Sequence, residues 1–194
     1  MKRGIIFTLI LLVFIPVCGF TYEVNVVSTS APNTDDKKKY YLGSGLEEID
    51  LRTLWYKKYE NYVERALILG GFTRTHKLKD AELVIFTIDG GGGPGAADAA
   101  WFPEHLPKAI PKLTCLYFLQ IRATVFGKED LIDIWVTTAY IFTPASDPWS
   151  RKYLPVLATA VIPYLGSNTG KIIKIKLNAN DKAVMEVKGL TNVN

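Results

Sequence analysis

The stretch from Cys115 to Phe142 reads CLYFLQIRATVF, then GKED, then LIDIWVTTAYIF. Both long segments are rich in aromatic and β-branched residues, and the short polar linker between them contains one glycine, Gly127. Two such runs joined by a short linker with a glycine are typical of a β-hairpin. The sequence therefore predicts two long antiparallel strands, and we expect the rest of the chain to fold around them.

The register of this hairpin follows from its turn. With the turn at 127–130, Phe126 faces Leu131 and Val125 faces Ile132. In this register the apolar residues of both strands share one face, which specifies the pairing strongly. That face would hold Tyr117, Leu119, Ile121, Ala123 and Val125 from the first strand, and Ile132, Ile134, Val136, Tyr140 and Phe142 from the second.

The other face of the hairpin would carry Phe118, Arg122 and Trp135. The same register places Arg122 opposite Trp135, close enough for a cation–π contact. One interpretation is a half-solvated sheet face. The other is a docking surface for a partner or ligand, formed by Phe118, Arg122 and Trp135, because a Trp beside an Arg is typical of interface anchors.

Residues 1–19 have the pattern of a targeting segment. Two basic residues precede an apolar run over residues 5–15, which is short for a membrane span. Three fates stay open: cleavage after Gly19, acylation of Cys18 as in bacterial lipoproteins, and retention as an anchor. We therefore expect an exported protein with a single α/β domain over residues 20–194. It would lie in the periplasm or on a membrane, for example as an outer-membrane lipoprotein.

The composition of the chain limits the classes of function that the sequence predicts. The chain has 194 residues and a formal net charge of +4, but Lys2 and Arg3 lie in the leader, which leaves only +2 for the domain. This balance is too near neutral to predict nucleic-acid binding. The two cysteines, Cys18 and Cys115, do not make a disulfide framework.

Further elements are expected on either side of the hairpin. Apolar residues at helical spacing predict helices over residues 44–71 and 150–165. Runs of alternating or continuous apolar residues predict strands at 22–28 and 81–88, and a terminal hairpin made of 171–177 and 183–187. Together these elements predict an α+β fold: a mainly antiparallel sheet with two helices packed on one face, as a two-layer sandwich.

The segment 89–95 reads DGGGGPG, and a glycine-rich loop after a strand invites a phosphate-binding interpretation. No Gly-Lys-Ser/Thr follows, however, and the prolines downstream prevent a clean helix start. We therefore expect a flexible loop over one end of the sheet.

The sequence offers little for catalysis or metal binding. His76 and His105 are the only histidines, and neither has a second ligand at metal spacing on one element. We therefore assign no catalytic, cofactor-binding or metal-binding residues. One alternative is a small exported hydrolase that uses the loop 89–105, with Asp89, Asp98 and His105 as candidates. Another is a periplasmic carrier that holds a small ligand between sheet and loop.

Several motifs resemble those of one protein family. In chain order they are YVERAL at 62–67 with GFTR at 71–74, DAELVI at 80–85, DIWVT at 133–137 and PYLGSNTG at 163–170. This order is similar to that of the DUF4136 type of bacterial envelope lipoprotein, over roughly residues 22–177. The resemblance implies a small α/β sandwich with helices on a mainly antiparallel sheet. It implies no activity and supplies no catalytic residues.

These observations favour a non-enzymatic envelope protein that binds another envelope protein or a membrane surface. The pattern specifies no cofactor and no oligomeric state. On this hypothesis Arg122→Ala and Trp135→Ala leave folding nearly intact but abolish partner capture. Collapse of the fold would instead show that this face of the hairpin is buried.

Overall fold

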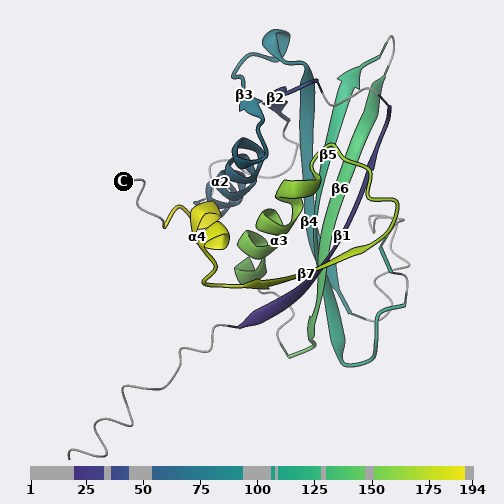
Figure 1. Ribbon diagram of the computed structural model, residues 1–194, viewed down its shortest axis with the longest axis vertical. Helices are drawn as coiled ribbons and strands as arrows, with labels where there is room; N and C mark the ends of the chain where they lie inside the picture. Colours follow the sequence, from purple (N-terminus) through teal and green to yellow (C-terminus); the bar gives the residue numbers. More distant parts are fainter. Residues whose placement is uncertain are drawn as a thin grey trace, which may run out of the picture.

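A computed structural model of the chain describes residues 20–32, 36–43, 54–93, 106–107, 109–127, 130–146 and 151–190 (Figure 1). Within these residues one mixed sheet runs in the strand order β3-β2-β4-β5-β6-β1-β7. The strands are β1 (Thr21–Ser30), β2 (Lys39–Leu42), β3 (Thr73–Arg74), β4 (Leu83–Gly92), β5 (Thr114–Phe126), β6 (Leu131–Pro144) and β7 (Ile173–Asn178). Strand β2 pairs in parallel with β3 and β4, whereas the other neighbouring strands pair antiparallel.

The helices lie on one face of this sheet (Figure 1). They are α2 (Leu54–Leu69), α3 (Leu154–Val161) and α4 (Lys182–Lys188), with 3-10 turns at Leu78–Asp80, Arg151–Tyr153 and Ile162–Tyr164. Every residue of α3 is buried, because α3 contacts the sheet as well as both other helices. The helices expected over 44–71 and 150–165 are present as the shorter α2 and α3, residues 44–53 lie outside the described residues, and the predicted α+β class is confirmed. No helix in the described ranges is long and apolar enough to cross a membrane.

The main core fills the space between the helices and the sheet. Its fully buried members come from all three helices and from several strands, and include Val24, Val26, Leu67, Leu119, Ile121, Leu157, Val161, Val184 and Val187. A second, smaller cluster lies on the opposite face of the sheet. It consists of Leu106, Ile110, Leu116, Phe118 and Tyr140. Part of the face without helices is therefore also covered.

The hairpin register is confirmed next to the turn and wrong beyond it. Phe126 pairs with Leu131 and Val125 pairs with Ile132, as expected. A β-bulge between Ala123 and Thr124 then shifts the register, so that Ala123 pairs with Trp135. Because a bulge inserts one residue into one strand, every later side chain of β6 points to the other face.

This shift corrects two expectations. Val136, Tyr140 and Phe142 lie on the face opposite the helices, because they pair with Arg122, Phe118 and Leu116. Arg122 therefore faces Val136, and the expected contact with Trp135 is wrong. Trp135 points toward the helices, where it is 2% exposed and its ring lies 5.7 Å from that of Phe72. The bulge lets both Ile134 and Trp135 join the main core, which buries more apolar surface than strict alternation would.

The segment after α3 closes over this end of the core. Thr169 donates its N–H to the carbonyl of Ser28 at 3.0 Å, and the Ser28 hydroxyl donates to the carbonyl of Ser167 at 2.9 Å. Gly166 has a φ of +75°, and a side chain there would lie against the indole of Trp135. The motif at 163–170 is thus a structural one that seals the buried tryptophan.

The C-terminal segment corrects a further expectation. Residues 183–187, predicted as the last strand, belong to helix α4. The buried residues Val184 and Val187 are three positions apart, which is a helical spacing. Gly189 ends the helix in a left-handed conformation with φ +72°. Strand β7 consequently pairs with β1 rather than with a terminal strand.

The glycine run also differs from the expected loop. Strand β4 continues through Gly92, and Gly90, Gly91 and Gly92 pair with residues of β5. A Cβ on Gly91 would lie 2.8 Å from the carbonyl oxygen of Leu116, so glycine is required for this close approach. These three glycines serve strand pairing and do not form a phosphate-binding loop.

Candidate docking surface at the tip of the β5–β6 hairpin

The tip of the long hairpin, where β5 ends and β6 begins, extends beyond α2, α3 and α4 (Figure 1). Gly127 donates its N–H to the carbonyl of Asp130 at 2.8 Å and closes this turn. A Cβ on Gly127 would lie 2.7 Å from that oxygen and 2.9 Å from the side chain of Ile132, so only glycine fits without a shift. Glycine at position 127 therefore allows the Asp130 carbonyl and the Ile132 side chain to approach the backbone closely.

Three large apolar side chains are exposed at this tip. Phe126 is 65% exposed, Ile132 55% and Leu131 44%. Phe126 and Leu131 are paired and share the face opposite the helices, whereas Ile132 lies on the other face. Since α2, with 16 residues, is about 24 Å long, and β6, with 14 residues, spans roughly 45 Å, α2 cannot cover the full length of the hairpin on its own face of the sheet. Ile132 is exposed on that face, whereas Phe126 and Leu131 are exposed on the face that carries no helices.

A charged pair borders the apolar tip. Arg122 and Asp133 form an ion pair and hydrogen bond, with side chains 40% and 38% exposed. Both lie on the face opposite the helices, next to Phe126 and Leu131. We name Arg122, Phe126, Leu131, Ile132 and Asp133 the hairpin-tip surface. An apolar centre beside a partly exposed charged pair is the usual composition of a protein-binding patch.

The structure separates the three residues proposed from the sequence as one site. Arg122 belongs to the hairpin-tip surface, but Phe118 is fully buried in the smaller cluster under Leu106 and Ile110. Trp135 is buried on the other face of the sheet. Cys18, the lipidation candidate, lies outside the described residues. Sequence reasoning counted Ile132 as core and missed the exposed tip. The helix expected over 44–71 would be about 42 Å long, which is close to the length of the expected strands, so the sequence alone offers no signal that the tip is uncovered.

The alternative sites are placed as follows. Asp98 and His105 of the hydrolase alternative lie outside the described residues. Asp89 lies on β4, where its carboxylate accepts a hydrogen bond of 3.0 Å from the Tyr117 hydroxyl. For a carrier, the structure offers an open recess of about 190 Å³ lined by Thr21, Tyr22, Glu23, Asn25, Ile141 and Phe142. It is smaller than the roughly 300 Å³ at which small-molecule pockets begin.

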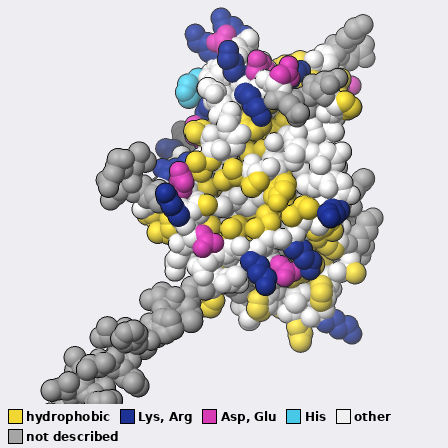
Figure 2. Space-filling model, viewed as in Figure 1, with side chains coloured by type: hydrophobic (Ala, Val, Ile, Leu, Met, Phe, Trp, Pro, Cys, Tyr) yellow, Lys and Arg dark blue, Asp and Glu magenta, His cyan; other side chains and the backbone are white. Residues whose placement is uncertain are grey.

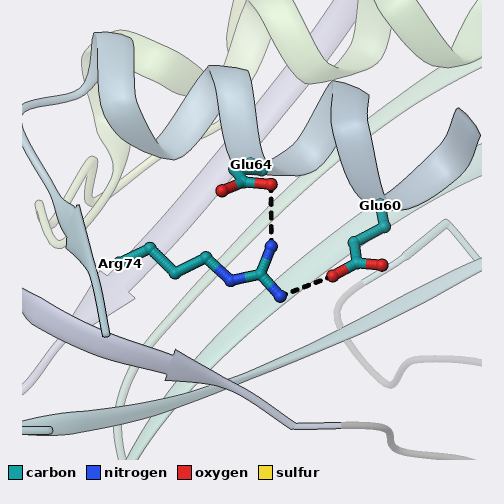
Figure 3. Close-up of polar contacts among 3 residues, drawn as sticks. All are labelled: Glu60, Glu64 and Arg74. Atoms are coloured by element: carbon teal, nitrogen blue, oxygen red, sulfur yellow. Dashed lines mark hydrogen bonds and ion pairs between the residues drawn. The ribbon is translucent and has the colours of Figure 1, made fainter. Parts of the chain in front are cut away.

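A second polar cluster lies under α2 (Figure 3). Arg74 of β3 donates to Glu60 at 2.6 Å and to Glu64 at 2.7 Å, so one guanidinium bridges two carboxylates on successive helical turns. Burial works to lower the pKa of Arg74, but the hydrogen bond and charge of these glutamates outweigh it and raise that pKa. This bridge ties the sheet edge to α2.

Tyr40 lies beside this bridge. Its side chain is fully buried, and its hydroxyl has no hydrogen-bond partner among the described residues. Burial raises the pKa of Tyr40 strongly, and the negative charge of Glu64 adds to the rise. The described residues hold no group of three or more His, Cys, Asp or Glu side chains that could bind a metal ion. The arrangement is that of a structural cluster.

Comparisons with known proteins give distant likenesses in fold. No protein-family model matches the chain, and no curated protein matches it. A PDZ domain protein from Parabacteroides distasonis is 14% identical with a TM-score of 0.49, and the match covers 82% of this chain but only 40% of that one. A DUF4136 family protein from Bacteroides thetaiotaomicron is 12% identical with a TM-score of 0.45, and the match covers 74% of this chain and 97% of that one.

Proposed function

We propose that this protein is an exported, non-enzymatic envelope protein that binds a partner protein through the hairpin-tip surface. The observation that carries the proposal is the exposure of Phe126, Leu131 and Ile132 at one projecting tip. Adjacent exposed side chains of this size do not contribute to the core and reduce solubility, so they mark interaction sites in folded proteins. The leader pattern over residues 1–19 supports export.

The charges around the tip favour a protein over a lipid surface. Asp130 and Asp133 are both exposed beside the apolar residues, and Arg122 is held by Asp133. The Arg122–Asp133 pair is neutral overall, which leaves the carboxylate of Asp130 to repel anionic lipid headgroups. A partner that offers an apolar pocket with a basic or hydrogen-bonding rim fits the surface better, because the rim can pair with Asp130.

The test uses single substitutions in the exposed apolar residues. Ile132→Ser and Phe126→Ser should each weaken binding to the partner at least about tenfold, as is typical of a central apolar anchor. Both side chains are more than half exposed, so the thermal unfolding midpoint should stay close to that of the wild type. Leu190→Ser is the matched control, since Leu190 is 62% exposed elsewhere on the molecule.

Binding would be measured by calorimetry with the purified partner captured from position 131. Equal affinity of the wild type, Ile132→Ser and Phe126→Ser would overturn the proposal. So would variants that bind the partner normally but lose binding to anionic vesicles, because the tip would then contact a membrane.

A further inference from the structure

The end of the sheet opposite the hairpin tip has an exposed leucine in an unfavourable backbone conformation. Leu113, which precedes β5, has a φ of +62° and is 84% exposed. It is the one non-glycine residue with a positive φ in the described ranges. A branched side chain is disfavoured in this conformation, for which glycine or asparagine is preferred. Neither packing nor backbone geometry therefore explains a leucine at this position.

The turn around Leu113 is firmly held. Thr114 donates its N–H and its hydroxyl to the carbonyl of Pro111, at 3.2 and 2.7 Å. Ala145 donates its N–H to the carbonyl of Leu113 at 3.0 Å, which ties the turn to the end of β6. The Leu113 side chain is thus presented outward by a fixed turn. Backbone strain that is maintained in this way is a pointer to function.

The chain enters the domain at the same end of the molecule (Figure 1). Phe20 is 77% exposed, and its carbonyl accepts the N–H of Ala179 at 3.2 Å beside the start of β1. Cys18 is three residues before Thr21, so the leader meets the domain within about 10 Å of the sheet. An acylated Cys18 or a retained anchor would hold this end against a membrane.

Exposed lysines lie toward this end, together with the acidic Glu23. Lys112 adjoins Leu113 and is exposed, and Lys176 is exposed on β7. Lys174 is exposed too, and it pairs with Glu23 at 3.0 Å. Figure 2 shows hydrophobic side chains at the lower end of the molecule with dark-blue Lys or Arg side chains near them. Exposed apolar residues with neighbouring lysines are the composition of surfaces that enter an anionic lipid interface.

We propose that Leu113 and Phe20 insert into the headgroup region of an anionic bilayer, with Lys112 against its phosphates. The inference rests on the export to the envelope proposed above and adds the membrane-facing end of the molecule. It also orients the domain. Strand β5 has 13 residues, so the hairpin tip stands roughly 40 Å from the lipid, where a partner protein can reach it.

The test uses the full chain as processed by an expressing bacterium, combined with vesicles of phosphatidylethanolamine and phosphatidylglycerol. A photoreactive phenylalanine analogue replaces Leu113, or Leu190 as a control that is also exposed. Irradiation should give a phospholipid adduct at position 113 with a yield at least about fivefold above that at 190. Equal yields at the two positions, or a protein adduct alone at position 113, would overturn the proposal.

A second variant separates membrane contact from folding. Leu113→Asn suits the left-handed conformation, so its unfolding midpoint should equal or exceed that of the wild type. A lower midpoint would show that Leu113 is a packing residue and would overturn the proposal. Neither the lipid adduct nor the unfolding midpoint involves the hairpin tip. A negative result in these two experiments therefore leaves the partner-binding proposal intact, and a negative result at the hairpin tip leaves the membrane proposal intact.

Discussion

Arg74 is the residue that joins the sheet edge to the helical layer. Its guanidinium is about one quarter exposed and is bonded to both Glu60 and Glu64. Charge-assisted hydrogen bonds of this kind, partly removed from water, contribute more than surface ion pairs. The adjacent Tyr40 differs from Arg74 in its hydrogen bonding, because its buried hydroxyl has no hydrogen-bond partner among the described residues. The two side chains make separate predictions about stability.

Arg74→Met should destabilise the protein by about 1–2 kcal/mol, because two glutamates lose their common partner. Urea unfolding followed by circular dichroism measures this change. Lys174→Met is the matched control. Its pair with Glu23 is 68% and 51% exposed, and such a pair is worth at most about 1 kcal/mol. Equal effects of the two substitutions would contradict a special role for Arg74.

Tyr40→Phe should leave stability at neutral pH unchanged or raise it, because it removes a buried hydroxyl that has no hydrogen-bond partner among the described residues. Above pH about 10 the unfolded tyrosine ionises while the folded one, with its raised pKa, does not. The stability that this group contributes is thus fully present below pH about 10 and is lost as the pH rises toward the folded pKa. The wild type should lose about 1 kcal/mol more than Tyr40→Phe between pH 10 and 11. Parallel urea titrations at these pH values check this, and equal losses would contradict it.

At the scale of elements, the hairpin shows how far sequence reasoning reaches. Its strands and the pairs Phe126–Leu131 and Val125–Ile132 follow from the turn and are confirmed. The bulge could not be predicted, because 134–136 reads Ile-Trp-Val and offers an apolar residue in either register. The alternation of apolar and polar residues therefore does not indicate the strand register here. The packing of Trp135 against the helices decides which register forms.

Trp135→Ala should cost about 3–5 kcal/mol, because it empties a large volume in the main core. Arg122→Ala should cost at most about 1 kcal/mol, since its ion pair is more than one third exposed. Denaturant unfolding of both variants measures the difference. A stable Trp135→Ala variant would show that the tryptophan is not packed in the core as described.

Helix α4 was mistaken for a strand for a related reason. The sequence KAVMEVK at 182–188 fits alternation through Ala183, Met185 and Val187, but it fits helical spacing through Val184 and Val187 equally well. The C-terminal end favours the helix, because Gly189 supplies the left-handed residue that ends it. The helix buries Val184 and Val187 together, whereas Ala183 of the alternating set is exposed.

The whole molecule has two functional ends in this account. The long hairpin, with helices on one face only, places the apolar tip at one end and the Leu113 turn with Phe20 at the other (Figure 1). The sequence predicted the sheet, its helical layer and Arg122 as a surface residue. It does not predict which apolar residues stay exposed, since exposure depends on how far the helices extend along one face of the strands and on which segments cover the other face.

The measurement that tests the central claim most directly is photo-crosslinking in living cells from position 131. Leu131 is 44% exposed and tolerates a photoreactive aromatic residue without disturbing the core. We predict a single recurrent envelope protein as the adduct, and its loss when Ile132→Ser is added to the same chain. Absence of a protein adduct from folded, abundant protein, or an adduct that persists with Ile132→Ser, would contradict the claim that the hairpin tip is a docking surface.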